Sequence, residues 1–102
     1  MFKHIVMWEL KDSAAGNNSI ENAVLIKSSL EKLPELIPQI LKYEIGINIS
    51  DSPASNDLLL YSEFKSKEDF EIYRDHTEHK KVVDLIRERT AKTHVVDYAD
   101  SK

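Results

Sequence analysis

Apolar and polar residues alternate along four stretches of the chain, residues 2–10, 40–49, 57–65 and 93–99. A repeat of two residues is typical of a β-strand with one apolar face. In the first stretch, one face carries Phe2, His4, Val6, Trp8 and Leu10. The second stretch alternates most clearly, and one of its faces carries Leu41, Tyr43, Ile45, Ile47 and Ile49. The pattern therefore predicts four strands.

Between the first two strands, apolar residues recur at spacings of three and four. The stripe consists of Ala23, Ile26, Leu30 and Leu33. This period predicts an amphipathic helix. Asn18 or Ser19 can cap its start, because Glu21 follows Asn18 at the spacing of a capping box. We expect a loop over residues 11–18 and the end of the helix at Pro34 and Pro38.

A second helical region precedes the last strand. Ser66 can cap it, and Phe70 and Tyr73 fall on its inner face. The stretch from His76 to His79 forms a junction, after which apolar residues from Val82 onward predict a further helix. The resulting order, β-α-β-β-α-β, is that of the ferredoxin-like α+β fold. We expect one domain over residues 1–102, with a four-stranded antiparallel sheet and its helices on one face.

The face of the sheet opposite the helices would then be open. Its expected residues are Ile5, Met7, Leu59, Tyr61 and Val95. A patch of this kind is too apolar to remain in water. A second copy of the chain that packs sheet against sheet would cover it, so the pattern predicts a homodimer that forms a dimeric α/β barrel.

Composition excludes several functions. The chain has 14 Lys and Arg against 18 Asp and Glu, for a net charge of −4, so we expect neither a nucleic-acid nor a membrane partner. It has no cysteine, which excludes disulfides and thiolate chemistry, and its two glycines form no phosphate-binding loop. We therefore expect no cofactor. The short apolar start does not fit a signal peptide, which makes the cytoplasm the expected location.

Several short motifs resemble one known family in their order and spacing. They are Lys3-His4-Ile5-Val6, Glu44-x-Gly46-x-Asn48, Tyr61-Ser62-Glu63-Phe64, Tyr73-x-x-His76-x-x-His79 and Val95-Val96-Asp97-Tyr98. Together they resemble the stress-responsive dimeric α/β-barrel (Dabb) family over nearly the whole chain. The resemblance implies a ferredoxin-like homodimer whose two sheets close a barrel. Most members have no assigned reaction. A plant relative, olivetolic acid cyclase, closes a polyketide ring without a cofactor, and related barrels include small monooxygenases.

The chain departs from the family pattern at two positions. Thr77 stands where the family usually has proline after the first histidine of the His-x-x-His stretch. Proline would break the helix there, and threonine should let it continue. Leu58 stands where the cyclase has a histidine, which argues against the same substrate.

The resemblance implies a pocket between the sheet and the helices. Tyr73 and His79 match the acid/base pair of the cyclase, with His79 as the base and Tyr73 as the group that orients a carbonyl. We expect His4, His76 and Trp8 to line the same pocket. The residues alone also allow a plainer interpretation, in which Tyr73 is a core aromatic and His4 a hydrogen-bonded structural histidine.

The pair His76 and His79 could support a metal. The chain has no HExxH motif, however, and we expect no bound metal. Two functions stay open. The first is a homodimer that binds a small aromatic or ketone-bearing molecule, with cofactor-free acid/base chemistry of a cyclase or lyase kind. The second is a stress-responsive dimer or ligand-binding protein without catalysis.

Overall fold

The computed structural model describes residues 1–100, and the expected domain ends two residues later, outside the described part. Four strands form one sheet in the order β4-β5-β1-β6, and every neighbouring pair is antiparallel. The strands are β1 (Phe2–Leu10), β4 (Ile40–Ile47), β5 (Leu58–Phe64) and β6 (Thr90–Ala99). This is the predicted ferredoxin-like α+β fold, which is confirmed.

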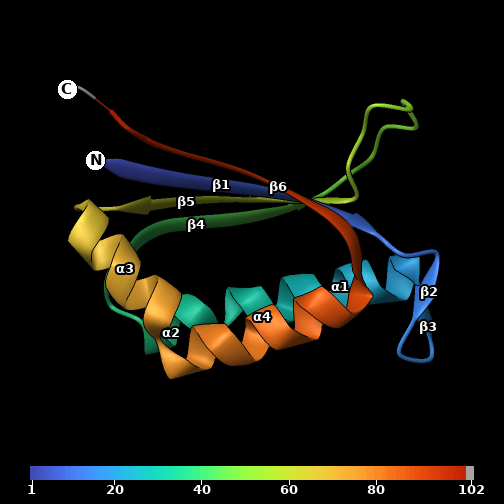
Figure 1. The fold of residues 1–102 in the computed structure, drawn as a ribbon, viewed down its shortest axis with the longest axis horizontal. Helices are drawn as coiled ribbons and strands as arrows, with labels where there is room; N and C mark the ends of the chain where they lie inside the picture. Colours follow the sequence, from blue (N-terminus) through green and yellow to red (C-terminus); the bar gives the residue numbers. More distant parts are fainter. Residues whose placement is uncertain (101–102) are drawn as a thin grey trace.

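The helices α1 (Ser19–Glu31), α2 (Leu33–Leu36), α3 (Lys67–Asp75) and α4 (Thr77–Arg89) cover one face of this sheet (Figure 1). Within residues 1–100, the opposite face carries no helix, as the pattern predicted. In the described part of the chain, no helix is long and apolar enough to cross a membrane.

The segment expected to be a loop contains a short hairpin instead. Strands β2 (Ser13–Ala14) and β3 (Asn17–Asn18) pair around Ala15 and Gly16. Both turn residues have positive φ, 53° and 82°. A two-residue hairpin turn of this kind matches the twist of its strands, and glycine adopts it without strain.

Helix α1 begins as predicted, with a capping box between Asn18 and Glu21. The Asn18 side chain accepts a hydrogen bond from the backbone amide of Glu21, and the Glu21 carboxylate accepts one from the backbone amide of Asn18. The predicted end is wrong in detail, because the helix stops at Glu31 and Pro34 lies in the first turn of α2. Proline is tolerated there because amides in a first turn have no intrahelical partner.

The expectation that Thr77 lets the helix continue is also wrong. Helix α3 ends at Asp75, and His76 has an extended backbone with φ −66° and ψ 137°. The His76 ring then caps α4, because its Nδ1 accepts the Glu78 amide at 3.1 Å. The helix therefore breaks at this position without a proline, and the His76 ring caps the helix that follows.

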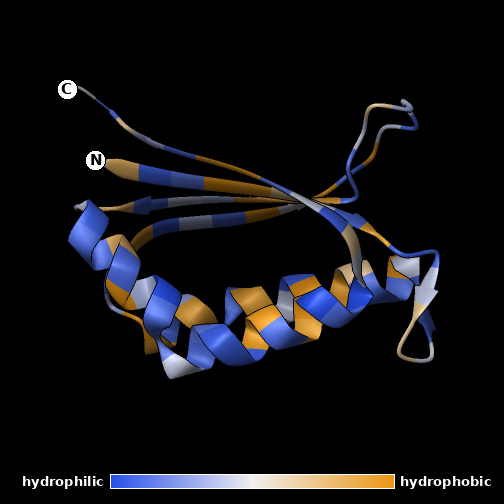
Figure 2. Ribbon diagram, in the orientation of Figure 1, coloured by the Kyte–Doolittle hydropathy of each residue, from blue (hydrophilic) through white to orange (hydrophobic). Residues whose placement is uncertain are grey.

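The core lies between the sheet and the helices. Strand β5 alternates between buried and half-buried residues along its whole length, as predicted. In β4 the predicted face is interrupted, because a bulge between Ile40 and Lys42 turns Leu41 outward, where it is 55% exposed. Ile40 packs against the core in its place. Figure 2 shows apolar residues recurring between polar ones along the helices.

One residue assigned to the open sheet face is misplaced. Val95 pairs with Val6 and therefore lies on the helix side, whereas Val96 pairs with Ile5 and lies on the open side. The alternation of the last strand was correct, but its sequence does not say which of two adjacent valines points inward. Both are about half exposed in the single chain, 51% and 54%.

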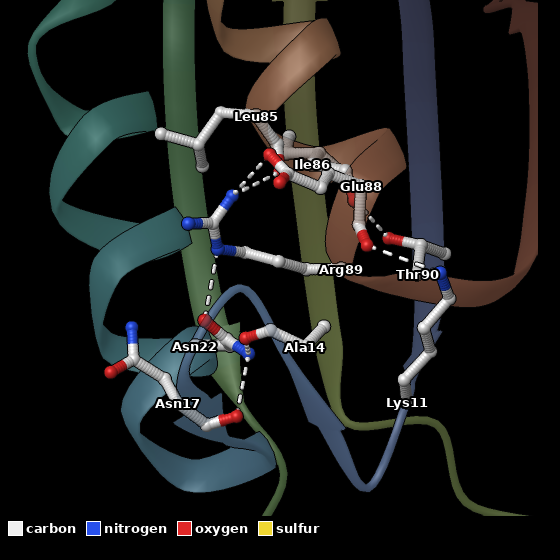
Figure 3. A network of polar contacts seen from close by, with 9 residues as sticks. All are labelled: Lys11, Ala14, Asn17, Asn22, Leu85, Ile86, Glu88, Arg89 and Thr90. Carbon is white, nitrogen blue, oxygen red and sulfur yellow. Dashed lines mark hydrogen bonds and ion pairs between the residues drawn. The ribbon is translucent and has the colours of Figure 1, made fainter.

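Buried polar groups join α1, α4 and the β2–β3 hairpin (Figure 3). Arg89 Nε donates to Asn22 Oδ1 at 2.9 Å, and Arg89 Nη1 donates to the Leu85 carbonyl. Asn22 Nδ2 in turn donates to the carbonyls of Ala14 and Asn17. Asn22 is fully buried and Arg89 is 9% exposed. A buried guanidinium needs such acceptors, because desolvation of an unpaired charge is costly.

We predict that Asn22→Ala lowers the free energy of unfolding by about 2–3 kcal/mol, because it removes the acceptor of a buried charged donor. Urea denaturation of both proteins measures the difference. Asn17→Ala is the control, since it keeps the backbone carbonyl that Asn22 uses, and it should change stability by less than about 0.5 kcal/mol. Equal losses in the two variants would contradict the prediction.

Candidate functional site

A cavity of about 350 Å³ lies between α4 and the strands β1 and β6. Strand β1 contributes alternate residues from its helix-side face, which are His4, Val6 and Trp8. Helix α4 contributes the stripe His79, Val82, Val83, Ile86 and Arg87. Residues at these spacings lie on one side of a helix. The volume and the apolar middle of the cavity are typical of a site for a small molecule.

Four of the five predicted site residues, His4, Trp8, Tyr73 and His79, line this cavity. They come from β1, α3 and the first turn of α4. His76 is not among the lining residues, because its ring is used to cap α4. His76 therefore stays outside the lining, although it is close enough to His79 to affect its pKa.

The His79 ring is held by the backbone. Its Nδ1 lies 2.9 Å from the Arg74 carbonyl oxygen, so Nδ1 carries a proton and donates it. In the neutral ring, Nε2 is then the nitrogen with a free lone pair. Burial lowers the pKa of His79 from its ordinary value of 6.5, and the nearby His4 and His76 add to this shift. At neutral pH the ring is therefore an uncharged proton acceptor.

Tyr73 is a buried lining residue of the cavity. Its side chain has no exposed surface, and its hydroxyl lies 2.7 Å from the hydroxyl of Tyr43. Burial raises the pKa of both phenols above the ordinary value of 10, so both stay protonated at neutral pH. The rings of Tyr73 and His79 are in contact, with centroids 4.2 Å apart. Tyr73 can thus donate a hydrogen bond but cannot act as a base.

His4 is anchored by a carboxylate. Its Nδ1 pairs with Asp97 Oδ1 across the β1–β6 register, in which the two residues are direct neighbours. A carboxylate at Nδ1 keeps the proton on that nitrogen and leaves Nε2 for another partner. The His4 side chain is 12% exposed. His4 also lies against the rings of Phe70 and Tyr73.

The sequence analysis missed the hydrogen-bond partners of two site residues, Tyr43 beside Tyr73 and Asp97 beside His4. Tyr43 had a signal, because it falls on the apolar face of its predicted strand and a buried phenol needs a partner. Asp97 had none, because only the register of β6 against β1 places it beside His4.

Among residues 1–100, no three His, Asp or Glu side chains are grouped closely enough to hold a metal ion. The two histidines considered for this role each use Nδ1 within the fold, His76 toward the Glu78 amide and His79 toward the Arg74 carbonyl.

The fold and the site define a ferredoxin-like α+β domain with a helix-side pocket. The sequence profile of the Stress responsive A/B Barrel Domain (Dabb) matches residues 2–100, and the chain belongs to this family. No protein among the curated sequences matches it.

Several solved structures are similar to this chain in fold. A dimeric protein of unknown function and ferredoxin-like fold from Bacteroides fragilis is 31% identical, with a TM-score of 0.78 and coverage of 97% of this chain and 95% of that one. A Dabb family protein from Mesorhizobium loti is 20% identical, with a TM-score of 0.77 and coverage of 99% and 97%. Hydroxynitrile lyase from Passiflora edulis is 18% identical, with a TM-score of 0.80 and coverage of 99% and 94%. The last two likenesses concern the fold alone.

We predict that His79 titrates below 6.5, because its pKa is lowered in the folded chain. The folded state then binds fewer protons than the unfolded state, so stability should fall as the pH drops below about 6.5 toward the folded pKa. NMR titration of the ring protons measures the pKa directly. His79→Gln should weaken the loss of stability with falling pH, whereas Lys80→Gln, one residue away and exposed, should keep it. Equal pH dependence in both variants would contradict the assignment.

Proposed function

We propose that this chain forms a homodimer that binds a small aromatic or ketone-bearing molecule in the cavity between α4 and β1. The observation that carries the proposal is the pair of imidazoles at one end of an apolar cavity. His4 and His79 are each fixed through Nδ1, which leaves two Nε2 atoms for a ligand. A few placed polar groups in an apolar pocket are typical of small-molecule sites.

The same arrangement supports acid/base chemistry without a cofactor. In this proposal His79 Nε2 removes a proton from the carbon next to a carbonyl, and the Tyr73 hydroxyl donates to the carbonyl oxygen as negative charge develops there. Tyr43 can donate to the Tyr73 oxygen, which frees the Tyr73 proton for the ligand. His79 returns the proton to complete the cycle. These are the roles that the resemblance to olivetolic acid cyclase implies for Tyr73 and His79.

Two further observations bear on this chemistry. A hydroxynitrile lyase has the same fold, so the architecture is compatible with acid/base catalysis. Leu58, which stands where the cyclase has a histidine in its third strand, is a core residue with 1% exposure. The chain therefore offers no imidazole at that position, and we propose a different substrate from that of the cyclase.

A second function, binding without catalysis, is favoured by one specific observation. Tyr73 is fully buried, and its hydroxyl already has a partner in Tyr43. If the hydroxyl stays with Tyr43 when a ligand binds, the carbonyl is not activated, and the cavity holds its ligand without reacting with it.

Proton exchange separates the two functions. With 2-acetylnaphthalene as the probe in D₂O, the catalytic proposal predicts that the protein accelerates deuterium exchange of the methyl protons, followed by NMR. His79→Gln should reduce the protein-catalysed exchange at least about a hundredfold, because a positioned base is lost. Tyr73→Phe should slow exchange while the chain remains folded in urea titrations.

Lys80→Gln is the matched control and should exchange the probe at the parental rate, because Lys80 is exposed and outside the cavity. Binding of the ketone without any His79-dependent exchange would exclude the catalyst and leave the binding protein. Failure of the ketone to bind at all would contradict both.

The dimer is supported by the open face of the sheet. Its central residues are Ile5, Met7, Leu59, Tyr61 and Val96, of which Val96 is 54% exposed. An apolar patch in this position favours a second sheet packed against it. The relative from Bacteroides fragilis is itself dimeric.

We predict that Val96→Asp shifts the protein from a dimer toward the 11.8 kDa single chain in sedimentation equilibrium at micromolar concentration. A carboxylate on this face would be buried without a partner in the dimer. Val24→Asp is the control, because Val24 is 57% exposed on α1 and lies in the helix layer, so this variant should remain dimeric. A parent protein that sediments only as the single chain would overturn the proposal.

A further inference from the structure

The cavity has two polar ends, and only one of them has a role in the proposed function. His4 and His79 lie at the first end. At the second end are Arg87, near the end of α4, and Thr90 and Thr93, near the start of β6. The chain places these three together, because β6 follows α4 directly and Thr93 pairs with Trp8 at the far end of the β1 face.

The separation of the two ends follows from regular geometry. His79 and Arg87 are eight residues apart on α4, which corresponds to about 12 Å along a helix. His4 and Trp8 are four residues apart on β1, which corresponds to about 13 Å along a strand. The wall between the ends is apolar and includes Val6, Val82 and Ile86. A ligand that fills the cavity therefore meets polar groups at both ends and apolar side chains between them.

The charge at the second end is positive. Among residues 1–100, no aspartate or glutamate lines the cavity, although acidic residues exceed basic ones in the chain as a whole. Arg87 forms an ion pair with Asp84 at 3.6 Å, and both side chains are more than three-quarters exposed. Such a pair is weak and leaves guanidinium donors available to another carboxylate. Lys92 borders the cavity as well, but strand alternation places its side chain on the opposite face, beside Glu9.

We propose that the ligand of this cavity is an elongated anion, with a carbonyl group at the His4 and His79 end and a carboxylate at the Arg87 end. This inference rests on the proposed function, because it names the class of molecule for the same cavity. Arg87 is the specificity-determining residue, and the Thr93 hydroxyl can donate to the same carboxylate, whereas the Thr90 hydroxyl already donates to the Ile86 carbonyl at 2.7 Å. The net charge of −4 repels anions in general, so a preference for an anion must come from this end of the cavity.

Two probes that differ only in the carboxylate test the proposal. 2-Acetylnaphthalene has the ketone alone, and 6-acetyl-2-naphthoate has the ketone and a carboxylate at opposite ends of the same ring system. At neutral pH and low ionic strength, we expect the acid to bind about fivefold more tightly, which is the size of an exposed arginine–carboxylate interaction. Changes in the intrinsic fluorescence of the probes give both affinities.

The variants locate the carboxylate. Arg87→Gln should abolish the advantage of the acid and leave the affinity for the ketone unchanged, and Arg87→Glu should make the acid the weaker ligand. Lys80→Gln removes the same charge from the same helix outside the cavity and should keep the full advantage. Added salt should reduce the advantage in the parent and not in Arg87→Gln.

The outcomes separate this inference from the proposed function. If the ketone binds and the acid binds no better, or if Arg87→Gln keeps the advantage, the anionic ligand is wrong and the cavity function stands. If the advantage is lost in Lys80→Gln as well, general electrostatics and not Arg87 is responsible, and the inference is overturned. If neither probe binds, both proposals fail.

Discussion

The candidate site depends on the antiparallel pairing of β1 with β6. Strand β1 lies inside the sheet and contacts β6 along nearly its whole length, from Phe2 opposite Ala99 to Leu10 opposite Thr90. This register sets Asp97 beside His4 and Thr93 beside Trp8, which are the two ends of the cavity. A shift of one residue would turn every β6 side chain to the other face, because side chains alternate along a strand. The polar ends of the site therefore exist only in this register.

Helix α4 completes the cavity, and its direction is set at His76. The extended backbone of this residue separates α3 from α4, and its ring compensates by capping the new helix. As a result His79 falls in the first turn of α4, within reach of the Arg74 carbonyl at the end of α3. The bend thus does two things at once: it places an imidazole against Tyr73, and it fixes which ring nitrogen is free.

Each buried polar side chain in the described chain has a hydrogen-bond partner, and two such groups join separate elements. Arg89 and Asn22 join the helices to the β2–β3 hairpin, and Tyr43 and Tyr73 join β4 to α3. No buried side-chain nitrogen or oxygen in the described chain lacks a hydrogen-bond partner. A satisfied network is stable and resists rearrangement. The Tyr73 hydroxyl already has one hydrogen bond, to Tyr43. It can contact a ligand only through a second hydrogen bond, and this restricts the chemistry of the site.

The sequence by itself determined the order of the four main strands and the long helices, the ferredoxin-like fold, the capping box of α1 and the helix-side position of His4, Trp8 and Tyr73. These follow from local period and capping chemistry, which are properties of neighbouring residues. Only the tertiary structure decided that Leu41 turns outward, that Val95 rather than Val96 faces the helices, and that Asp97 meets His4. Each of these depends on a bulge or on the register between strands far apart in the chain, and no local pattern encodes that register. At His76 the sequence indicated a junction, but only the structure showed that the helix breaks there despite Thr77 and that the His76 ring caps α4, because that cap depends on where the ring lies relative to the Glu78 amide.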